Sequence, residues 1–277
     1  MTHMTEPREH WLTAADGTEL FVRDWPLEAA GAGVVLLHGI GEHSGRYAHV
    51  ARFFNEQGYA VRTYDHRGHG RSGGARGDVP GADALIEDAR LAIEDFARRL
   101  ARPPLLVGHS MGGLYAAYYA TRGVSPLSGL ILSSPALAIR LSGAQRLLLR
   151  LLEAAAPGLG VANRLDVRYL SHRPDVIEAY SSDPLVHRRI SARLLNSMLA
   201  AAEYAQAAAS GLNVRTLVLV AGEDRLVDAR GSVAFHAQLA PGVGTLHRYA
   251  GYYHELFNEA EAGRVFEDVR AWLVELR

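Results

Sequence analysis

The chain has 277 residues and 48% of them are hydrophobic, so it is long enough to bury a large core. Its net charge of −1 gives no excess of positive charge for binding a nucleic acid. It contains no cysteine, which excludes disulfides, thiolate catalysis and cysteine-ligated metals, and no lysine that could form a Schiff base. We expect neither a metal nor another cofactor.

The N-terminal segment comes first in chain order. Residues 1–11 are polar and lack the apolar stretch of a signal peptide. No apolar run reaches the roughly 18 residues that a membrane span needs, so we expect a cytoplasmic protein that contacts a membrane at most from its periphery. Residues 11–25 alternate polar and apolar side chains around Asp16-Gly17, which predicts a β-hairpin.

Strands and helices then alternate. Short apolar runs predict buried strands, and apolar residues at helical spacing predict helices. The strands are expected at residues 34–37, 59–64, 105–107 and 130–132, and the helices at residues 47–57, 82–100 and 111–121. This order favours an α/β fold with a mostly parallel central sheet and helices on both faces.

The alternation stops between residues 136 and 210, where we expect helices at 141–156 and 191–209 and no strand. It resumes with strands at 215–220 and 246–249 and helices at 227–239 and 260–276. A helical insertion into one domain explains this better than a second domain. We therefore predict an α/β core of residues 1–135 and 211–277, with residues 136–210 as a helical cap.

Residues 108–112 read GHSMG, the G-x-S-x-G pattern of a nucleophile elbow. An apolar strand precedes it and an apolar helix follows it, as the α/β-hydrolase fold requires. The glycines allow strand and helix to approach closely around a serine on a strained turn. We predict that Ser110 is a nucleophile and that the backbone N–H of Met111 is one oxyanion donor.

A serine nucleophile needs a base, and in this fold an acid and then a histidine follow it along the chain. Asp224 lies just after a late predicted strand, and we favour it over Glu223 and Asp228. We expect Asp228 to cap or support the next helix. For the base we favour His254, which lies in a loop after the last strand, over His236 and His247.

The second oxyanion donor is expected in the loop after an early strand. Ile40 lies between Gly39 and Gly41, directly after the strand at 34–37, and its N–H is our candidate. We expect His38 to order this loop through hydrogen bonds. Asp65, His66 and His69 have a spacing that could suggest a metal site, but in a glycine-rich loop we interpret them as a structural turn.

Several segments together resemble the monoacylglycerol lipases and lysophospholipase-like enzymes of the α/β-hydrolase superfamily. They extend over most of the chain and comprise residues 41–47 (GEHSGRY), 64–72 (YDHRGHGRS), 108–113 (GHSMGG), 182–185 (SDPL), 221–228 (AGEDRLVD) and 253–255 (YHE). The resemblance implies the α/β-hydrolase fold with a helical cap over the active site. It also implies a triad of Ser110, Asp224 and His254.

The resemblance further implies a polar end of the pocket for a glycerol-like leaving group. The matching positions are Glu42, Arg46, His109 and Tyr180. Glu42 and Arg46 could equally form a structural ion pair that holds the loop. Likewise, leucines at 147, 148, 151 and 152 would normally pack into a core, although in a cap they could also line the substrate route or touch lipid.

These observations predict a serine carboxylic-ester hydrolase that cleaves monoacylglycerols or similar single-chain lipid esters through an acyl-enzyme. The expected partner is a small lipid ester, with transient contact to a membrane surface through the cap. One alternative is a general carboxylesterase for short-chain or xenobiotic esters. Another is an inactive binding protein with a hydrolase fold, but the presence of all three triad residues argues against it.

Overall fold

The computed structural model describes residues 6–27 and 31–276, and a sheet of eight strands lies at its centre. The strands lie in the order β1 (Arg8–Thr13), β2 (Glu19–Trp25), β4 (Ala60–Tyr64), β3 (Gly33–Leu37), β5 (Leu105–His109), β6 (Gly129–Ser133), β9 (Thr216–Ala221) and β10 (Gly244–Tyr249). The pairs β1–β2 and β2–β4 are antiparallel, and all the other neighbouring pairs of this sheet are parallel. The predicted mostly parallel sheet is confirmed.

The strand sequences explain this arrangement. The central parallel strands are continuous apolar runs, such as GVVLL in β3 and TLVLVA in β9, and every residue of these two strands is buried. Strands buried on both faces need helices on both sides. At the edge, β1 and β2 form the predicted hairpin, and Gly17 in its turn has a φ of 84°, which favours glycine.

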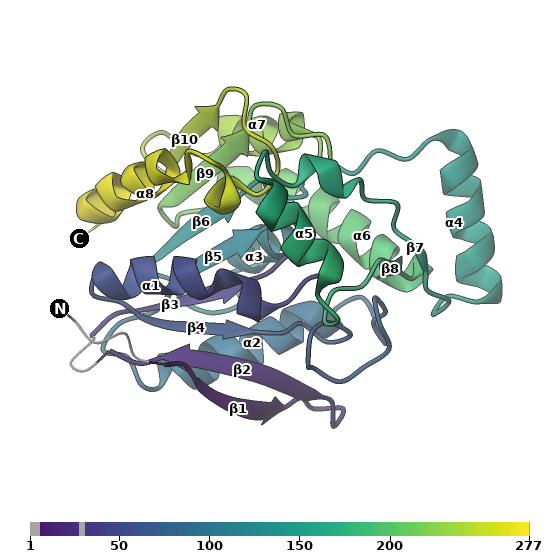
Figure 1. Cartoon of the computed structure of the whole chain (residues 1–277), viewed down its shortest axis with the longest axis horizontal. Coiled ribbons are helices and arrows are strands. Elements are labelled where there is room, and N and C mark those ends of the chain that lie inside the picture. The colour runs from purple at the N-terminus through teal and green to yellow at the C-terminus, as the bar shows by residue number, and fades with distance from the viewer. Residues whose placement is uncertain (1–5, 28–30, 277) are drawn as a thin grey trace.

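Helices cover both faces of the sheet (Figure 1). One layer contains α1 (Ala48–Glu56) and α8 (Ala262–Leu276), and the other contains α2 (Ala84–Ala97), α3 (Met111–Thr121), α6 (Ala192–Ala208) and α7 (Ala229–Gln238). In α1, Val50, Phe53 and Phe54 lie on one face and are buried against the sheet, as their spacing predicts. Each such burial contributes about 1.5–3 kcal/mol.

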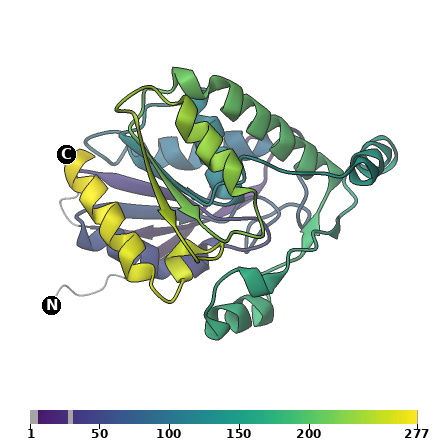
Figure 2. The same ribbon diagram turned by 90° about the horizontal axis from the view of Figure 1, so that it is seen from above.

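Residues 136–210 contain α4 (Gly143–Ala155), α5 (Pro174–Ser182) and α6. They also contain β7 (Val161–Ala162) and β8 (Arg189–Ile190), which pair with each other, so the expectation of no strand here was wrong. Strands of two residues are too short to leave an alternating pattern. α6 packs on α3, whereas α4 lies at the outer edge of the molecule and contacts α6 (Figures 1 and 2). The division into core and cap stays a prediction.

Short 3-10 turns connect several of these elements: η1 (Ser44–Tyr47), η2 (Val167–Tyr169), η3 (Ala209–Gly211) and η4 (Leu256–Asn258). Within residues 6–27 and 31–276, none of the helices has the length and hydropathy needed to span a bilayer. Residues 1–5, which begin the polar N-terminal segment, lie outside the described residues.

Candidate active site

Ser110 occupies the sharp turn between β5 and α3. Its φ of 54° and ψ of −117° are unusual for a residue with a side chain, and such strain is typical of functional sites. A Cβ atom on Gly112 would collide with the carbonyl oxygens of Leu37 and His38, and one on Gly108 would collide with Gly112. The two glycines therefore let α3 approach β3 and β5 closely enough to form this turn.

The predicted acid and base follow the last two strands of the sheet, Asp224 after β9 and His254 after β10. His254 Nδ1 donates to Asp224 Oδ2 over 2.7 Å, and both side chains are buried. The other carboxylate oxygen of Asp224 accepts the backbone N–H groups of Leu226 and Val227 at 2.9 and 3.0 Å. Asp224 is therefore held in one orientation, and it fixes the imidazole ring in turn.

Electrostatics favour the charged form of this pair. Burial disfavours the imidazolium form of His254, but the carboxylate of Asp224 outweighs it and raises the pKa of His254 above its ordinary value. Burial likewise acts against the Asp224 carboxylate, but His254 and the hydrogen bonds to Asp224 lower the pKa of this acid. The arrangement suits a base that becomes an imidazolium during the reaction.

The loop after β3 is held by the buried side chain of His38. Its Nδ1 donates to the carbonyl oxygen of Gly39 over 2.7 Å, and its Nε2 accepts the backbone N–H of His66 over 2.9 Å. Burial keeps the pKa of His38 well below its ordinary value, so the ring is neutral and serves both bonds. The ordering role predicted for His38 is confirmed.

The two predicted oxyanion donors lie in the loop after β3 and at the start of α3. Met111 is the first residue of α3, and N–H groups in the first turn of a helix have no partner within it. Ile40 lines the same cavity as Ser110, and the neighbouring Gly41 has a φ of 78°. The donor roles of Ile40 and Met111 remain a prediction.

A cavity of about 620 Å³ opens beside Ser110 and His254. Its surface is mostly apolar, and the main apolar side chains come from residues 136–210: Ile139, Leu148, Leu149, Leu152, Leu195 and Met198. Four polar residues of the lining lie near Ser110 and His254: Glu42, His109, Tyr180 and Glu255. Other polar residues of the lining belong to the 136–210 segment: Arg140, Gln145, Asn163, Arg164 and Ser191. The cavity is therefore mostly apolar, and we call the first four residues its polar end.

Residues 28–261 match the family model described as serine aminopeptidase, S33. The chain belongs to this family. It is a serine hydrolase with the α/β-hydrolase fold. Over 272 residues it is 35% identical to a monoacylglycerol lipase of Mycolicibacterium smegmatis, with 96% of each chain covered.

Two further proteins are similar to this chain. The chain is 34% identical to phospholipase YtpA of Bacillus subtilis over 252 residues, which cover 90% of this chain and 97% of that protein. The crystal structure of Paleococcus ferrophilus monoacylglycerol lipase superposes with a TM-score of 0.84 at 35% identity, covering 94% of this chain and 100% of that one. The resemblance inferred from the motifs is confirmed.

Of the four residues predicted to contact the leaving group in this S33-family hydrolase, Glu42, His109 and Tyr180 line the cavity. Arg46 instead donates to Glu42, so the ion pair that we considered as the alternative is present. The ring of Tyr180 packs against the guanidinium of Arg46, whose centre lies 4.8 Å from the ring centroid. Burial and the nearby His254 lower the pKa of His109 to about 4, so it is neutral at pH 7. Contact of these residues with substrate remains a prediction.

Sequence reasoning missed the role of Glu255. Its carboxylate accepts two hydrogen bonds from the guanidinium of Arg46, at 2.7 and 2.8 Å. A third hydrogen bond, from Asn258 Nδ2, reaches it over 2.8 Å. The available signal was its position directly after the predicted base His254. Nothing in the sequence indicated that a residue 209 positions away would pair with it.

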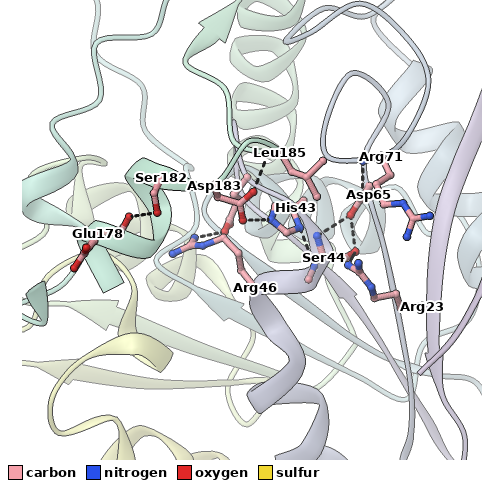
Figure 3. A network of polar contacts seen from close by, with 12 residues as sticks. Arg23, His43, Ser44, Arg46, Asp65, Arg71, Glu178, Ser182, Asp183 and Leu185 are labelled. Atoms are coloured by element: carbon pink, nitrogen blue, oxygen red, sulfur yellow. Dashed lines mark hydrogen bonds and ion pairs between the residues drawn. The ribbon is translucent and has the colours of Figure 1, made fainter. Parts of the chain in front are cut away.

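The 136–210 segment is bonded to the loop after β3 and to the loop that carries His254. Figure 3 shows His43, in the loop after β3, beside Asp183 at the end of α5. His43 Nε2 donates to Asp183 Oδ2 over 2.8 Å, and His43 Nδ1 accepts the backbone N–H of Gly45. The backbone N–H of His187 also donates to Gly41 over 2.8 Å. On the other side, the backbone N–H of His254 donates to Tyr169 over 3.3 Å.

The competing acids and histidines have other places in the fold. Asp228 caps α7, as expected, by accepting the N–H of Arg230 over 3.1 Å. His247 lies on β10 beside Asp268, 3.5 Å away, and not beside Asp224.

The loop after β4 is a structural turn, as predicted. Asp65 there accepts the backbone N–H groups of Ser44 and Arg71 at 2.8 and 2.7 Å (Figure 3). Across the part of the chain that the structure describes, no group of histidine, cysteine and acidic residues has a metal-binding arrangement.

The leucine stripe of α4 does not pack into a core. Leu147, Leu148 and Leu151 are exposed, and Leu148 and Leu152 line the cavity. The favoured interpretation of these leucines as core was therefore wrong. α4 lies at the outer edge of the molecule, where it contacts α6 and buries Leu149, so most of its apolar face stays exposed (Figure 2).

Proposed function

We propose that this protein hydrolyses monoacylglycerols, with Ser110 as nucleophile, His254 as base and Asp224 as the acid that orients it. The observation that carries the proposal is the mostly apolar cavity that Ser110 lines together with the four residues of the polar end. An acyl chain fits the apolar surface, and a glycerol-like alcohol fits the polar end. Two of the similar proteins bear the name monoacylglycerol lipase.

The reaction would proceed in two steps through an acyl-enzyme. His254 takes the proton from Ser110 as Oγ attacks the ester carbonyl, and Asp224 stabilises the resulting imidazolium. The N–H groups of Ile40 and Met111 stabilise the oxyanion of the tetrahedral intermediate. The imidazolium then gives its proton to the leaving alcohol. In the second step His254 takes a proton from water as the water attacks the acyl-enzyme, and it returns the proton to Ser110 Oγ as the fatty acid leaves.

Charge at the polar end favours a neutral alcohol over a phosphorylated one. Glu42 and Glu255 both line the cavity beside the catalytic residues. The guanidinium of Arg46 lies between these two carboxylates and is paired with both. The two arginines that line the cavity, Arg140 and Arg164, belong to the 136–210 segment, and Arg140 is paired with Asp228. A phosphate next to Ser110 would therefore meet negative charge. This supports glycerol esters over lysophospholipids, although one similar protein is named a phospholipase.

The test compares substrates on one enzyme preparation. The wild type should hydrolyse monoacylglycerols and p-nitrophenyl esters of long chains, and act much more slowly on lysophosphatidylcholine and lysophosphatidylglycerol. Ser110→Ala should abolish both this activity and labelling by a fluorophosphonate. Activity confined to short esters would favour a general carboxylesterase, and faster cleavage of lysophospholipids would overturn the preference. Absence of any esterase activity would overturn the proposal.

We further propose that α4 contacts the lipid surface from which substrate is drawn. Leu147 and Leu151 are each 59% exposed, and Arg146 and Arg150 on the same helix are also exposed. Exposed leucines with nearby arginines suit the interface of an anionic bilayer. The cavity is lined by Leu148 of this helix, so an acyl chain leaving the bilayer would meet it directly.

Replacing Leu147 and Leu151 together with serine should weaken binding to vesicles of phosphatidylcholine and phosphatidylglycerol by roughly tenfold or more, since about 1.5–3 kcal/mol is expected per buried leucine. Hydrolysis of a soluble short-chain ester should not change. Val274→Ser is the matched control, because Val274 is 64% exposed on α8, which belongs to the core layers. Equal binding by all three proteins would exclude this contact.

A further inference from the structure

The buried ion pairs at the polar end connect the two catalytic loops. Arg46 donates to Glu42 and, with both terminal nitrogens, to Glu255. Glu42 Oε1 accepts the backbone N–H of Gly39 and the hydroxyl of Tyr47, each over 2.6 Å. Gly39 precedes the predicted oxyanion donor, and Glu255 follows the predicted base. The guanidinium of Arg46 therefore links the loop after β3, which carries Ile40, to the loop that carries His254.

We propose that Glu255 is a positioning residue for His254 and that it acts through Arg46 and Glu42. The inference rests on the proposed function, because it takes His254 as the base. It differs from the role that the family resemblance implies for Arg46, which was contact with the leaving group.

The contacts favour positioning over substrate binding. Glu42 already accepts hydrogen bonds from Gly39, Tyr47 and Arg46. Three N–H groups of Arg46 point at carboxylates, and Tyr180 covers one face of its guanidinium. The side chains of Arg46, Glu42 and Glu255 are only 11%, 3% and 5% exposed. Bidentate pairing of an arginine with a carboxylate is strong and directional, so it suits a fixed link.

The same groups set the charge around the imidazole. The ionisable and charged groups around His254 come from four segments: Asp224 after β9, His109 in the elbow, Glu42 and Arg46 in the oxyanion loop and η1, and Glu255 in its own loop. After Asp224, Glu255 and then Glu42 raise the pKa of His254. Removing the charge of Glu255 should therefore destabilise the imidazolium and lower this pKa.

The experiment is the pH profile of kcat/KM for a soluble ester, measured on wild type, Glu255→Gln and Asp88→Asn. Asp88 forms a similar buried bidentate pair, with Arg67 at 2.5 and 2.6 Å, away from the catalytic residues. Both variants replace a carboxylate with an amide of the same shape. In Glu255→Gln, the acid limb should move to lower pH by roughly half a unit. Its kcat should fall roughly tenfold, with KM nearly unchanged. Asp88→Asn should leave the limb in place.

A second pair of variants separates positioning from simple loss of stability. Arg46→Lys keeps the charge but cannot pair bidentately with Glu255, so it should retain only part of the activity, whereas Arg46→Met should lose it together with the link. If Glu255→Gln keeps the wild-type acid limb and loses activity only in proportion to its loss of thermal stability, the positioning role is wrong. That outcome differs from failure of the proposed function, in which the wild type itself would hydrolyse no ester and would not react with a fluorophosphonate.

Discussion

A single hydrogen bond, from His254 to Asp224, governs how activity should depend on pH. In the proposed mechanism His254 must be unprotonated to accept the proton of Ser110, so we expect kcat/KM to rise with pH through the pKa of His254. Asp224 raises that pKa. In Asp224→Asn the acid limb should therefore move to lower pH. The rate should also fall by about 10⁴, because an amide supports the wrong tautomer of the ring. Steady-state kinetics between pH 4 and 9 would measure both effects.

Asp228→Asn provides the control for this prediction. Asp228 lies four positions along the chain and caps α7. Its replacement should change kcat/KM by no more than about twofold and leave the acid limb unmoved. If the two variants lost activity equally, the assignment of Asp224 as the orienting acid would be wrong.

Some residues of the candidate site could be found from the sequence, and others could not. Ser110, Asp224 and His254 each follow a predicted strand, and the carboxyl ends of parallel strands meet at one edge of a sheet. Local patterns therefore placed them near one another. The pairing of Arg46 with Glu255 joins two loops 209 residues apart, and no local pattern specifies such a contact.

Among the elements, α5 connects the 136–210 segment to the loop after β3, which carries the proposed oxyanion donor Ile40. A hydrogen bond from His43 to the carboxylate of Asp183 joins them, and the two side chains are 7% and 26% exposed. Asp183→Asn should weaken this pair and reduce kcat/KM for a long-chain monoacylglycerol by roughly three- to tenfold, since a hydrogen bond to a charged group contributes about 1.5–3 kcal/mol and partial exposure reduces this. Amide hydrogen exchange should become faster in residues 180–190 and 39–47.

The matched control lies on the same helix. Asp175 pairs with Arg173 at the exposed start of α5, so Asp175→Asn alters the charge of α5 equally without touching the oxyanion loop. Its kinetics and hydrogen exchange should stay close to those of the wild type. Faster exchange in residues 39–47 of this control would show that the Asp183 pair has no special role.

The elements differ in how far the sequence specifies them. The buried parallel strands were predicted because apolar runs such as β3 can only lie between two helical layers. The apolar face of α4 was misjudged because spacing shows that a helix has such a face, but not whether the fold provides a partner for it. The strands β7 and β8 were missed because each has two residues.

At the scale of the whole molecule, buried histidines should control stability in acid. Burial lowers the pKa of four fully buried histidines: His38, His66, His69 and His109. In the unfolded chain a histidine titrates near pH 6.5. As the pH falls below that value, the unfolded chain binds protons that the folded chain does not. The folded state is therefore fully favoured above about pH 6.5 and loses stability below it, down to the lower folded pKa values.

The size of this effect can be predicted. Each proton changes the free energy of unfolding by about 1.4 kcal/mol per pH unit, so these four histidines contribute a slope of roughly 5 kcal/mol per unit near pH 5. His49 and His187, whose pKa values burial also lowers, add to this slope. His254, whose folded pKa is raised, is protonated in both states at that pH and adds nothing. Urea unfolding should give a constant midpoint from pH 8 to 7 and a steep fall below pH 6. His69→Gln removes one titrating ring, whose Nε2 is buried without a partner, and should reduce the slope by about 1.4 kcal/mol per unit. An equal midpoint at pH 7 and pH 5 would show that these rings are protonated in the folded protein and that their burial does not set its acid stability.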